Sequence, residues 1–303
     1  MHGFLSDENF EKFRNTIYNE SGITFTFANR SILENRLKAR LRQLKLARLD
    51  EYHRVIADDK TELQAFLDSV TTNLTRFFRN PAHVDAFEHY VLPQLLRVKD
   101  PDDRTVRVWS AGCSSGEEPY TVAMVMREIL PRPFSIAVVA TDISLSSLMI
   151  GREGCYDENQ LKAVPERYLN KYFERCQSGY RIAEEIRRLV TFEYHNLKDD
   201  SRLRNQDVVL CRNVLLYFDK PAQRAVLKRF WDVMAPYSFL FIGSSESLLE
   251  IGSSLAFLKT SWAALYQKNI AVSAGTCPAE AAASAAADAA MKDAPAGADA
   301  DGQ

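Results

Sequence analysis

The stretch Val108-Trp-Ser-Ala-Gly-Cys-Ser-Ser-Gly-Glu-Glu118 joins a short apolar run to a segment with helical spacing, 117–130. A strand, a glycine turn and a helix in this order are typical of an open α/β sheet, whose ligands bind where the strands end. Gly112 and Gly116 allow a ligand to approach the backbone, and the helix start presents free N–H groups. The stretch therefore predicts an α/β domain with a ligand site at this turn.

The residues of this turn restrict the class of ligand that it can bind. It has neither the GxGxxG spacing of dinucleotide sites nor the GK[ST] of a phosphate-binding loop. Glu117 and Glu118 at the helix start would repel a pyrophosphate but suit an ammonium or sulfonium group. The same pair could simply complement the helix dipole of a tight turn, so the turn alone leaves both interpretations open.

The rest of the chain repeats the alternation of strand and helix. Strand-like runs at 136–140, 189–194, 206–211 and 239–243 alternate with helical segments, including 144–152 and 221–234. This alternation predicts βαβ units and a parallel sheet. The segment 169–188 breaks it with short runs that turn at 177–179, which predicts a small antiparallel insertion. Residues 1–75 carry only helical spacing and predict a separate bundle.

Polar residues follow four successive predicted strands. The glycine turn follows the first, and Asp142 ends the second, where an acidic side chain usually holds a ribose diol. Asp142 could equally cap the next helix. Asn196 follows the third strand and Asn213 the fourth. Because the carboxyl ends of parallel strands meet at one edge, these clusters predict one shared site.

Composition excludes several classes of protein. The 303 residues carry 38 Lys and Arg against 40 Asp and Glu, which excludes a general polycation for nucleic acid. No apolar window is long enough to span a membrane, and the N-terminus lacks a signal-peptide pattern. The five cysteines are scattered without a CxxC pair, which predicts reduced thiols, a cytoplasmic location and no metal site. Residues 271–303, with 15 alanines and no aromatic residue, predict a disordered tail.

Five motifs stand out along the chain, at 71–79, 109–120, 140–143, 211–218 and 243–247. Together they resemble the motifs of the CheR family, the chemoreceptor protein-glutamate O-methyltransferases. The resemblance implies a class I, Rossmann-like methyltransferase domain of α/β class at 76–270, with a β-subdomain inserted at about 169–188. It also implies a helical receptor-docking domain at 1–75. The activity it implies is methyl transfer from S-adenosylmethionine to receptor glutamates, which gives methyl esters and S-adenosylhomocysteine.

The resemblance also assigns residues. Arg79 and Tyr217 are expected to orient the incoming carboxylate as catalytic residues, although Tyr217 could instead be a packing residue. The expected contacts to S-adenosylmethionine are Asn73, Thr75, Arg79, Gly112, Glu118, Asp142, Asn196, Leu197, Asn213 and Val214.

The segment 30–48 carries seven basic residues and one acidic residue. Such a run can be a solvated face, or it can attract the acidic helical domain of a receptor. Arg36, Arg40 and Arg42 match basic positions of the family's docking helix. Nucleic acid fits less well because no aromatic residues interleave with the charges. The expected partners are therefore the cytoplasmic helical domains of chemoreceptors. The chain itself is expected to be a monomer that does not insert into the membrane.

Two departures and two alternatives accompany this hypothesis. Pro236-Tyr237-Ser238 replaces the family's Pro-Gly-Gly turn, and the hairpin at 177–179 is short, which argues against tethering to a receptor's C-terminal peptide. One alternative is an inactive scaffold that senses S-adenosylmethionine and recruits partners. The other is a methyltransferase that acts on nucleic acid or a small molecule.

Overall fold

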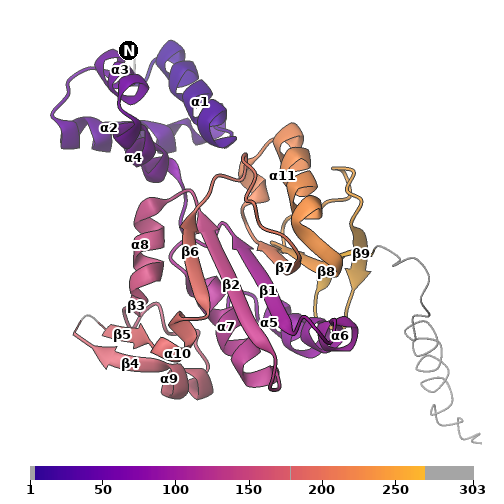
Figure 1. Cartoon of the computed structure of the whole chain (residues 1–303). Coiled ribbons are helices and arrows are strands. Elements are labelled where there is room, and N and C mark those ends of the chain that lie inside the picture. The colour runs from indigo at the N-terminus through magenta and orange to yellow at the C-terminus, as the bar shows by residue number, and fades with distance from the viewer. Residues whose placement is uncertain (1–3, 178, 270–303) are drawn as a thin grey trace, which may run out of the picture. The chain divides into compact units, whose positions relative to one another are not determined.

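The computed structural model describes residues 4–177 and 179–269, and its first helices pack around a core of their own (Figure 1). They are α1 (Asp7–Ser21), α2 (Arg30–Leu44), α3 (Leu49–Asp58) and α4 (Lys60–Val70), with a 3₁₀ turn at Phe27–Asn29. The Ser6 side chain caps α1 by accepting a hydrogen bond from the Asn9 N–H. Phe10, Phe13 and Ile17 are fully buried and form the face of this helix that packs in the core of the bundle.

A buried ion pair links three of these helices. Arg40 in α2 donates to both carboxylate oxygens of Glu62 in α4, and the Tyr52 hydroxyl of α3 donates to Glu62 Oε1 at 2.8 Å. The side chains of Arg40 and Glu62 are only 12% and 8% exposed. The prediction that Arg40 belongs to a docking surface is therefore wrong, because its guanidinium neutralises a carboxylate inside the helical bundle.

The second part of the chain is built on a seven-stranded sheet of order β6-β2-β1-β7-β8-β10-β9. The first five strands in this order are parallel, and β10 and β9 are antiparallel to their neighbours. The bounds are β1 (Thr105–Ala111), β2 (Ser135–Asp142), β6 (Val190–Tyr194), β7 (Gln206–Cys211), β8 (Met234–Ile242), β9 (Ala256–Lys259) and β10 (Ala264–Lys268). The predicted parallel sheet is confirmed, and β9 is a strand that the sequence pattern did not predict.

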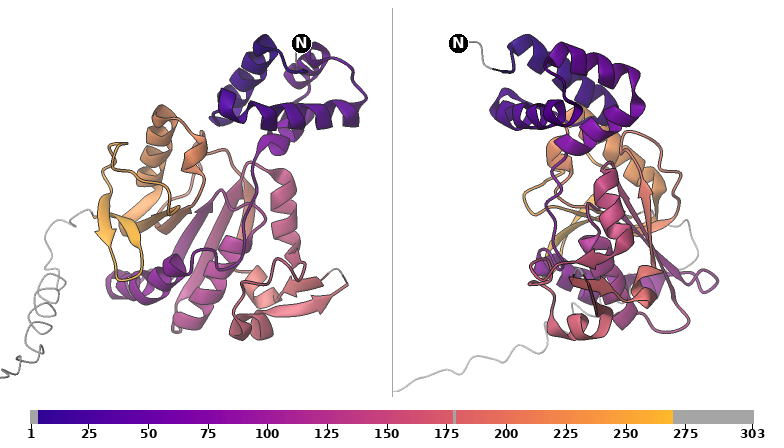
Figure 2. Two further views of the ribbon diagram at one scale, coloured as in Figure 1. Left: turned by 180° about the vertical axis from the view of Figure 1, so that it is seen from behind. Right: turned by 90° about the vertical axis from the view of Figure 1, so that its left-hand side faces the viewer.

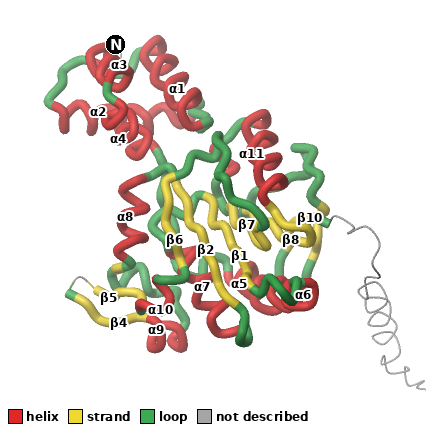
Figure 3. The backbone as a smooth tube through the Cα atoms, in the orientation of Figure 1, coloured by secondary structure: helices red, strands yellow, loops and turns green. Residues whose placement is uncertain are grey.

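Helices cover both faces of this sheet (Figures 2 and 3). One face packs against α5 (Pro81–Ala86), a π-helical turn (Phe87–Val91), α6 (Leu92–Val98), α7 (Glu117–Ile129) and α8 (Leu145–Glu153). The other face packs against α11 (Lys220–Val233). The chain runs outward from β1 to β6 and then returns to β7 on the other side of β1. The carboxyl ends of β1 and β7 therefore flank the switch point, where open α/β sheets bind ligands.

A small antiparallel sheet follows α8, as predicted, in the order β3-β5-β4. It consists of β3 (Cys155–Tyr156), β4 (Phe173–Cys176) and β5 (Gly179–Ile182), with α9 (Glu166–Tyr172) before β4 and α10 (Glu184–Arg187) after β5. Its strands begin earlier than the predicted insertion because β3 pairs with β5 across the intervening helix.

The replaced glycine turn keeps an unusual backbone. Tyr237 lies within β8 at φ 57°, in the left-handed region that favours glycine, and its hydroxyl lies 3.2 Å from Gln94 Oε1. The register between β7 and β8 shifts at this place. A tyrosine thus occupies a conformation that glycine adopts more readily.

Two further predictions concern the C-terminal segment and the absence of a membrane-spanning helix. The Ala-rich segment 271–303, which includes Cys277, lies outside the described residues. In the part that is described, no helix is long and apolar enough to cross a membrane.

The Arg40–Glu62 pair gives a test of the bundle. Replacing Glu62 with Ala leaves the Arg40 charge largely buried without a carboxylate partner, so the free energy of unfolding should fall by about 3–5 kcal/mol. Urea unfolding measures this change. Arg36→Ala, at an exposed position on the same helix, is the matched control and should change stability by less than about 0.5 kcal/mol. Equal stability of the Glu62→Ala variant and the wild type would contradict the assigned role.

Candidate active site

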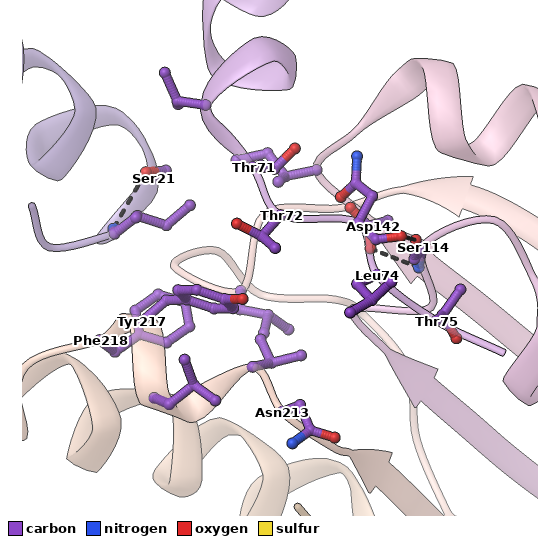
Figure 4. A pocket seen from close by; sticks show the side chains of 18 of the residues that line it. Ser21, Thr71, Thr72, Leu74, Thr75, Ser114, Asp142, Asn213, Tyr217 and Phe218 are labelled. Atoms are coloured by element: carbon purple, nitrogen blue, oxygen red, sulfur yellow. Dashed lines mark hydrogen bonds between the residues drawn. The ribbon is translucent and has the colours of Figure 1, made fainter. Parts of the chain in front are cut away.

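A cavity of about 290 Å³ lies at the carboxyl edge of the sheet (Figure 4). Figure 4 shows Asp142 and Ser114 on one side of it and Tyr217 and Phe218 on the other. Its walls come from the β1–α7 turn, the ends of β2, β6 and β7, the segment 70–79 and the loop after α1. All ten residues predicted to contact a cofactor line this cavity, as does Tyr217. The exposed Arg36 and Arg42 do not line it.

The glycine turn forms one wall and cannot accept a side chain at Gly112. This residue has φ 82°, and a Cβ built on it would lie 2.5 Å from Val214 Cγ2. The Gly112 and Cys113 N–H groups both donate to the Thr141 carbonyl, at 2.8 and 2.9 Å. The turn is thereby fixed to the end of β2.

Asp142 joins the glycine turn to the start of α8. Its Oδ1 accepts from the Ser144 N–H at the start of α8, and its Oδ2 accepts from the Ser114 N–H of the glycine turn, each at 2.8 Å. The side chain is 8% exposed, and burial raises the pKa of its carboxyl. A carboxylate offers about four acceptor sites, so two remain for hydroxyl groups of a ligand in the cavity.

The segment 71–80 packs along the glycine turn. Asn73 donates from its amide to Ser144 Oγ at 3.1 Å, and its carbonyl accepts from Ser114 Oγ at 3.0 Å. Arg79 Nη1 donates to the Leu74 carbonyl at 3.0 Å. These contacts hold Asn73, Thr75 and Arg79 at the rim of the cavity.

Arg212 is the residue that the sequence analysis missed. Its Nη1 donates to Glu118 Oε2 at 3.1 Å, and its Nη2 donates to the Arg79 carbonyl at 2.5 Å. Glu118 Oε1 also accepts from Ser110 Oγ at 2.7 Å. The Arg212 side chain is 8% exposed. The sequence did offer a signal for this pair, because Arg212 follows one predicted strand and Glu118 begins the helix after another.

Glu246 is a second missed residue. Its carboxylate accepts from the backbone N–H groups of Gly243, Asn213 and Leu216. These bonds fix the loop after β7, in which Asn213 has φ 61° and lines the cavity.

Asn196 lines the cavity, but its side chain is largely used elsewhere. Its amide donates to the Glu20 carbonyl at 2.6 Å, and its Oδ1 accepts from the Lys198 N–H at 3.1 Å. The side chain therefore joins the sheet edge to the end of α1.

Family models match nearly the whole described chain. The model described as CheR methyltransferase, all-alpha domain, matches residues 8–71, and the one described as CheR methyltransferase, SAM binding domain, matches residues 73–264. The chain belongs to the CheR methyltransferase family.

Curated relatives agree with this assignment. A chemotaxis protein methyltransferase of Borreliella burgdorferi is 32% identical over 77% of this chain and 85% of its own length. The corresponding protein of Escherichia coli is 35% identical over 80% of this chain and 85% of its own length. Chemotaxis protein methyltransferase 2 of Vibrio cholerae is 31% identical over 82% of this chain and 88% of its own length.

As a member of the CheR family, the chain is a methyltransferase that uses S-adenosylmethionine. The donor set of the cavity fits this cofactor. Asp142 has acceptor sites left for ribose hydroxyls, and the Glu118 carboxylate, which is paired with Arg212, also lines the cavity. Leu197, Val214 and Phe218 supply apolar surface for a planar base.

His83 lies below the site and is held neutral. It lines a cavity of about 30 Å³ together with Arg212 and Glu118. The residue is 7% exposed, and its Nδ1 has no hydrogen-bond partner in residues 4–177 and 179–269. Burial, with a smaller contribution from the Arg212 charge, lowers its pKa from 6.5 to about 4.

This shift predicts a pH dependence of stability. The unfolded chain binds a proton at His83 below about pH 6.5, whereas the folded chain does so only near pH 4. The free energy of unfolding should therefore fall by about 2–3 kcal/mol between these values and show no contribution from His83 above them. The His83→Phe variant should lack this part of the decline in urea unfolding. Parallel pH profiles of variant and wild type would contradict the assignment.

Proposed function

We propose that the chain transfers methyl groups from S-adenosylmethionine to glutamate side chains of chemoreceptors, the methyl-accepting chemotaxis proteins, for sensory adaptation. The observation that carries this proposal is the uncompensated charge of Arg79 at the rim of the cavity. Asp142 and the Glu118–Arg212 ion pair line the same cavity, whereas Arg79 has no carboxylate partner among the described residues. An anionic substrate entering at the rim meets Arg79. The relatives named as chemotaxis protein methyltransferases support the same substrate class.

The proposed methyl transfer requires little chemical assistance from the protein. S-Adenosylmethionine supplies an activated methyl group on a sulfonium. A glutamate carboxylate has an ordinary pKa near about 4.3 and is already a nucleophile at neutral pH, so no general base is required. The carbon–sulfur bond breaks as the carbon–oxygen bond forms, and neither step moves a proton. The residues of the cavity therefore act by positioning both partners and excluding water.

Each residue of the rim has a proposed role. Arg79 would bind the incoming carboxylate through its guanidinium. Tyr217 would orient the same group, since its hydroxyl makes no hydrogen bond within the described part of the chain. The ten cavity residues named above would hold the cofactor. Asn196 would do so mainly through its backbone, because its side chain has partners in the protein.

One assay tests the proposed function. The full chain is incubated with methyl-labelled S-adenosylmethionine and the cytoplasmic fragment of a chemoreceptor, and base-labile label on the fragment is expected. Asp142→Asn, which removes a carboxylate from the cavity but keeps the size of the side chain, is the control and should transfer less label. Label on RNA instead would support the nucleic-acid alternative. Cofactor binding without any transfer would support the scaffold.

The docking surface is proposed to lie on α2 and to consist of Arg36 and Arg42. Both side chains are exposed, and neither has a carboxylate partner in the described part of the chain. Exposed charges of this kind attract an acidic partner over a distance and are screened by salt. They act on capture of the receptor and leave the chemical step unchanged.

Replacing Arg36 and Arg42 with Ala should therefore lower kcat/KM for the receptor fragment by about 2- to 10-fold and leave kcat and cofactor affinity unchanged. The wild-type rate should fall with added salt, and the variant should lose much of this dependence. Arg104→Ala, an exposed arginine just before β1, is the matched control. Wild-type kcat/KM and salt response in the double variant would mean that these arginines are only a solvated face.

A further inference from the structure

A second hollow of about 350 Å³ adjoins the candidate active site. The segment 71–80 contributes Arg76, Arg79 and Asn80, and the ends of β7 and β8 contribute Arg212, Asn213 and Ser244. Arg79, Arg212 and Asn213 also line the larger cavity, so the two spaces meet at these residues. Among the residues that the structure describes, no acidic side chain lines the hollow.

The charges of the three arginines are not all compensated. Arg212 is paired with Glu118, and Arg79 donates only to a backbone carbonyl. Arg76 is exposed and makes neither a hydrogen bond nor an ion pair within the described residues. If Arg79 binds the target carboxylate, Arg76 remains as a guanidinium without an anion. The hollow therefore carries a positive charge on Arg76 that no acidic side chain of the described residues compensates.

The backbone that carries Arg76 is held firmly. The neighbouring Phe77 and Phe78 are buried at 0% and 8% exposure, and the Phe78 N–H donates to Thr121 Oγ1 in α7 at 3.1 Å. The Arg79 carbonyl is held by Arg212. The backbone of Arg76 is therefore fixed beside the rim, which favours a specific contact of its side chain over general attraction.

We propose that this hollow binds a second acidic side chain of the polypeptide substrate, with Arg76 as the residue that recognises its carboxylate. The inference rests on the proposed function, because it requires that the target is a glutamate of a protein. On a helical substrate, side chains three or four residues apart share a face. The preferred targets are then glutamates with an acidic residue at one of these spacings.

The test compares the wild type with Arg76→Gln, using the full chain and a receptor fragment whose methylated glutamates are first mapped by mass spectrometry. In the fragment, the acid three or four residues from the target is replaced by Gln. Each change alone should raise KM by about 2- to 5-fold with kcat unchanged, as expected of an exposed ion pair. Combined, they should raise KM little further, because both remove the same contact. Arg76→Lys should restore part of the effect, and Arg104→Gln should have none.

Several results would overturn the inference. Equal KM for the wild type and Arg76→Gln would show that the hollow does not recognise substrate. Independent, multiplying effects of the two changes would place the flanking acid elsewhere. A weaker affinity of Arg76→Gln for S-adenosylmethionine, measured by calorimetry, would assign the hollow to the carboxylate of the cofactor. Failure of the wild type to methylate any fragment would overturn the proposed function together with this inference, whereas the other results leave the proposed function standing.

Discussion

The guanidinium of Arg212 holds together the parts of the site that come from different regions of the chain. It neutralises Glu118 at the start of α7 and fixes the carbonyl of Arg79 in the segment that follows the helical bundle. Both contacts are almost removed from solvent. Losing one partner of such a pair leaves an uncompensated buried charge, which costs several kcal/mol. The positions of Glu118 and of the Arg79 backbone at the cavity therefore both depend on the Arg212 side chain at the end of β7.

The helical bundle also takes part in the site. The Thr24 N–H donates to the Tyr217 carbonyl at 2.8 Å, and Asn196 donates to the carbonyl of Glu20 at the end of α1. Gln64 in α4 donates to the Ile143 carbonyl at 2.8 Å, just beyond β2. Through these contacts the bundle closes one side of the cavity. Arg36 and Arg42 of α2 remain exposed, so the proposed docking surface lies on the same bundle that closes the cavity.

Much of this architecture could be predicted from the sequence, because it follows from local patterns. The period of apolar residues located the strands and helices, and polar residues after each strand located the site edge. The partners of individual charges could not be predicted. Arg40 belongs to a basic run, yet Glu62 lies 22 positions away in sequence and draws it into the bundle. Arg212 is paired with Glu118 across 94 positions, and only the sheet order brings the two together. β9 was missed because it is short and mostly exposed.

We propose that Arg212 organises the cofactor site through Glu118 and Arg79. Calorimetric titration of S-adenosylmethionine into the Arg212→Gln variant tests this proposal most directly, provided that circular dichroism shows a folded chain. The dissociation constant is expected to rise by at least about tenfold, or about 1.4 kcal/mol in binding free energy. A folded variant that binds the cofactor with wild-type affinity would contradict it.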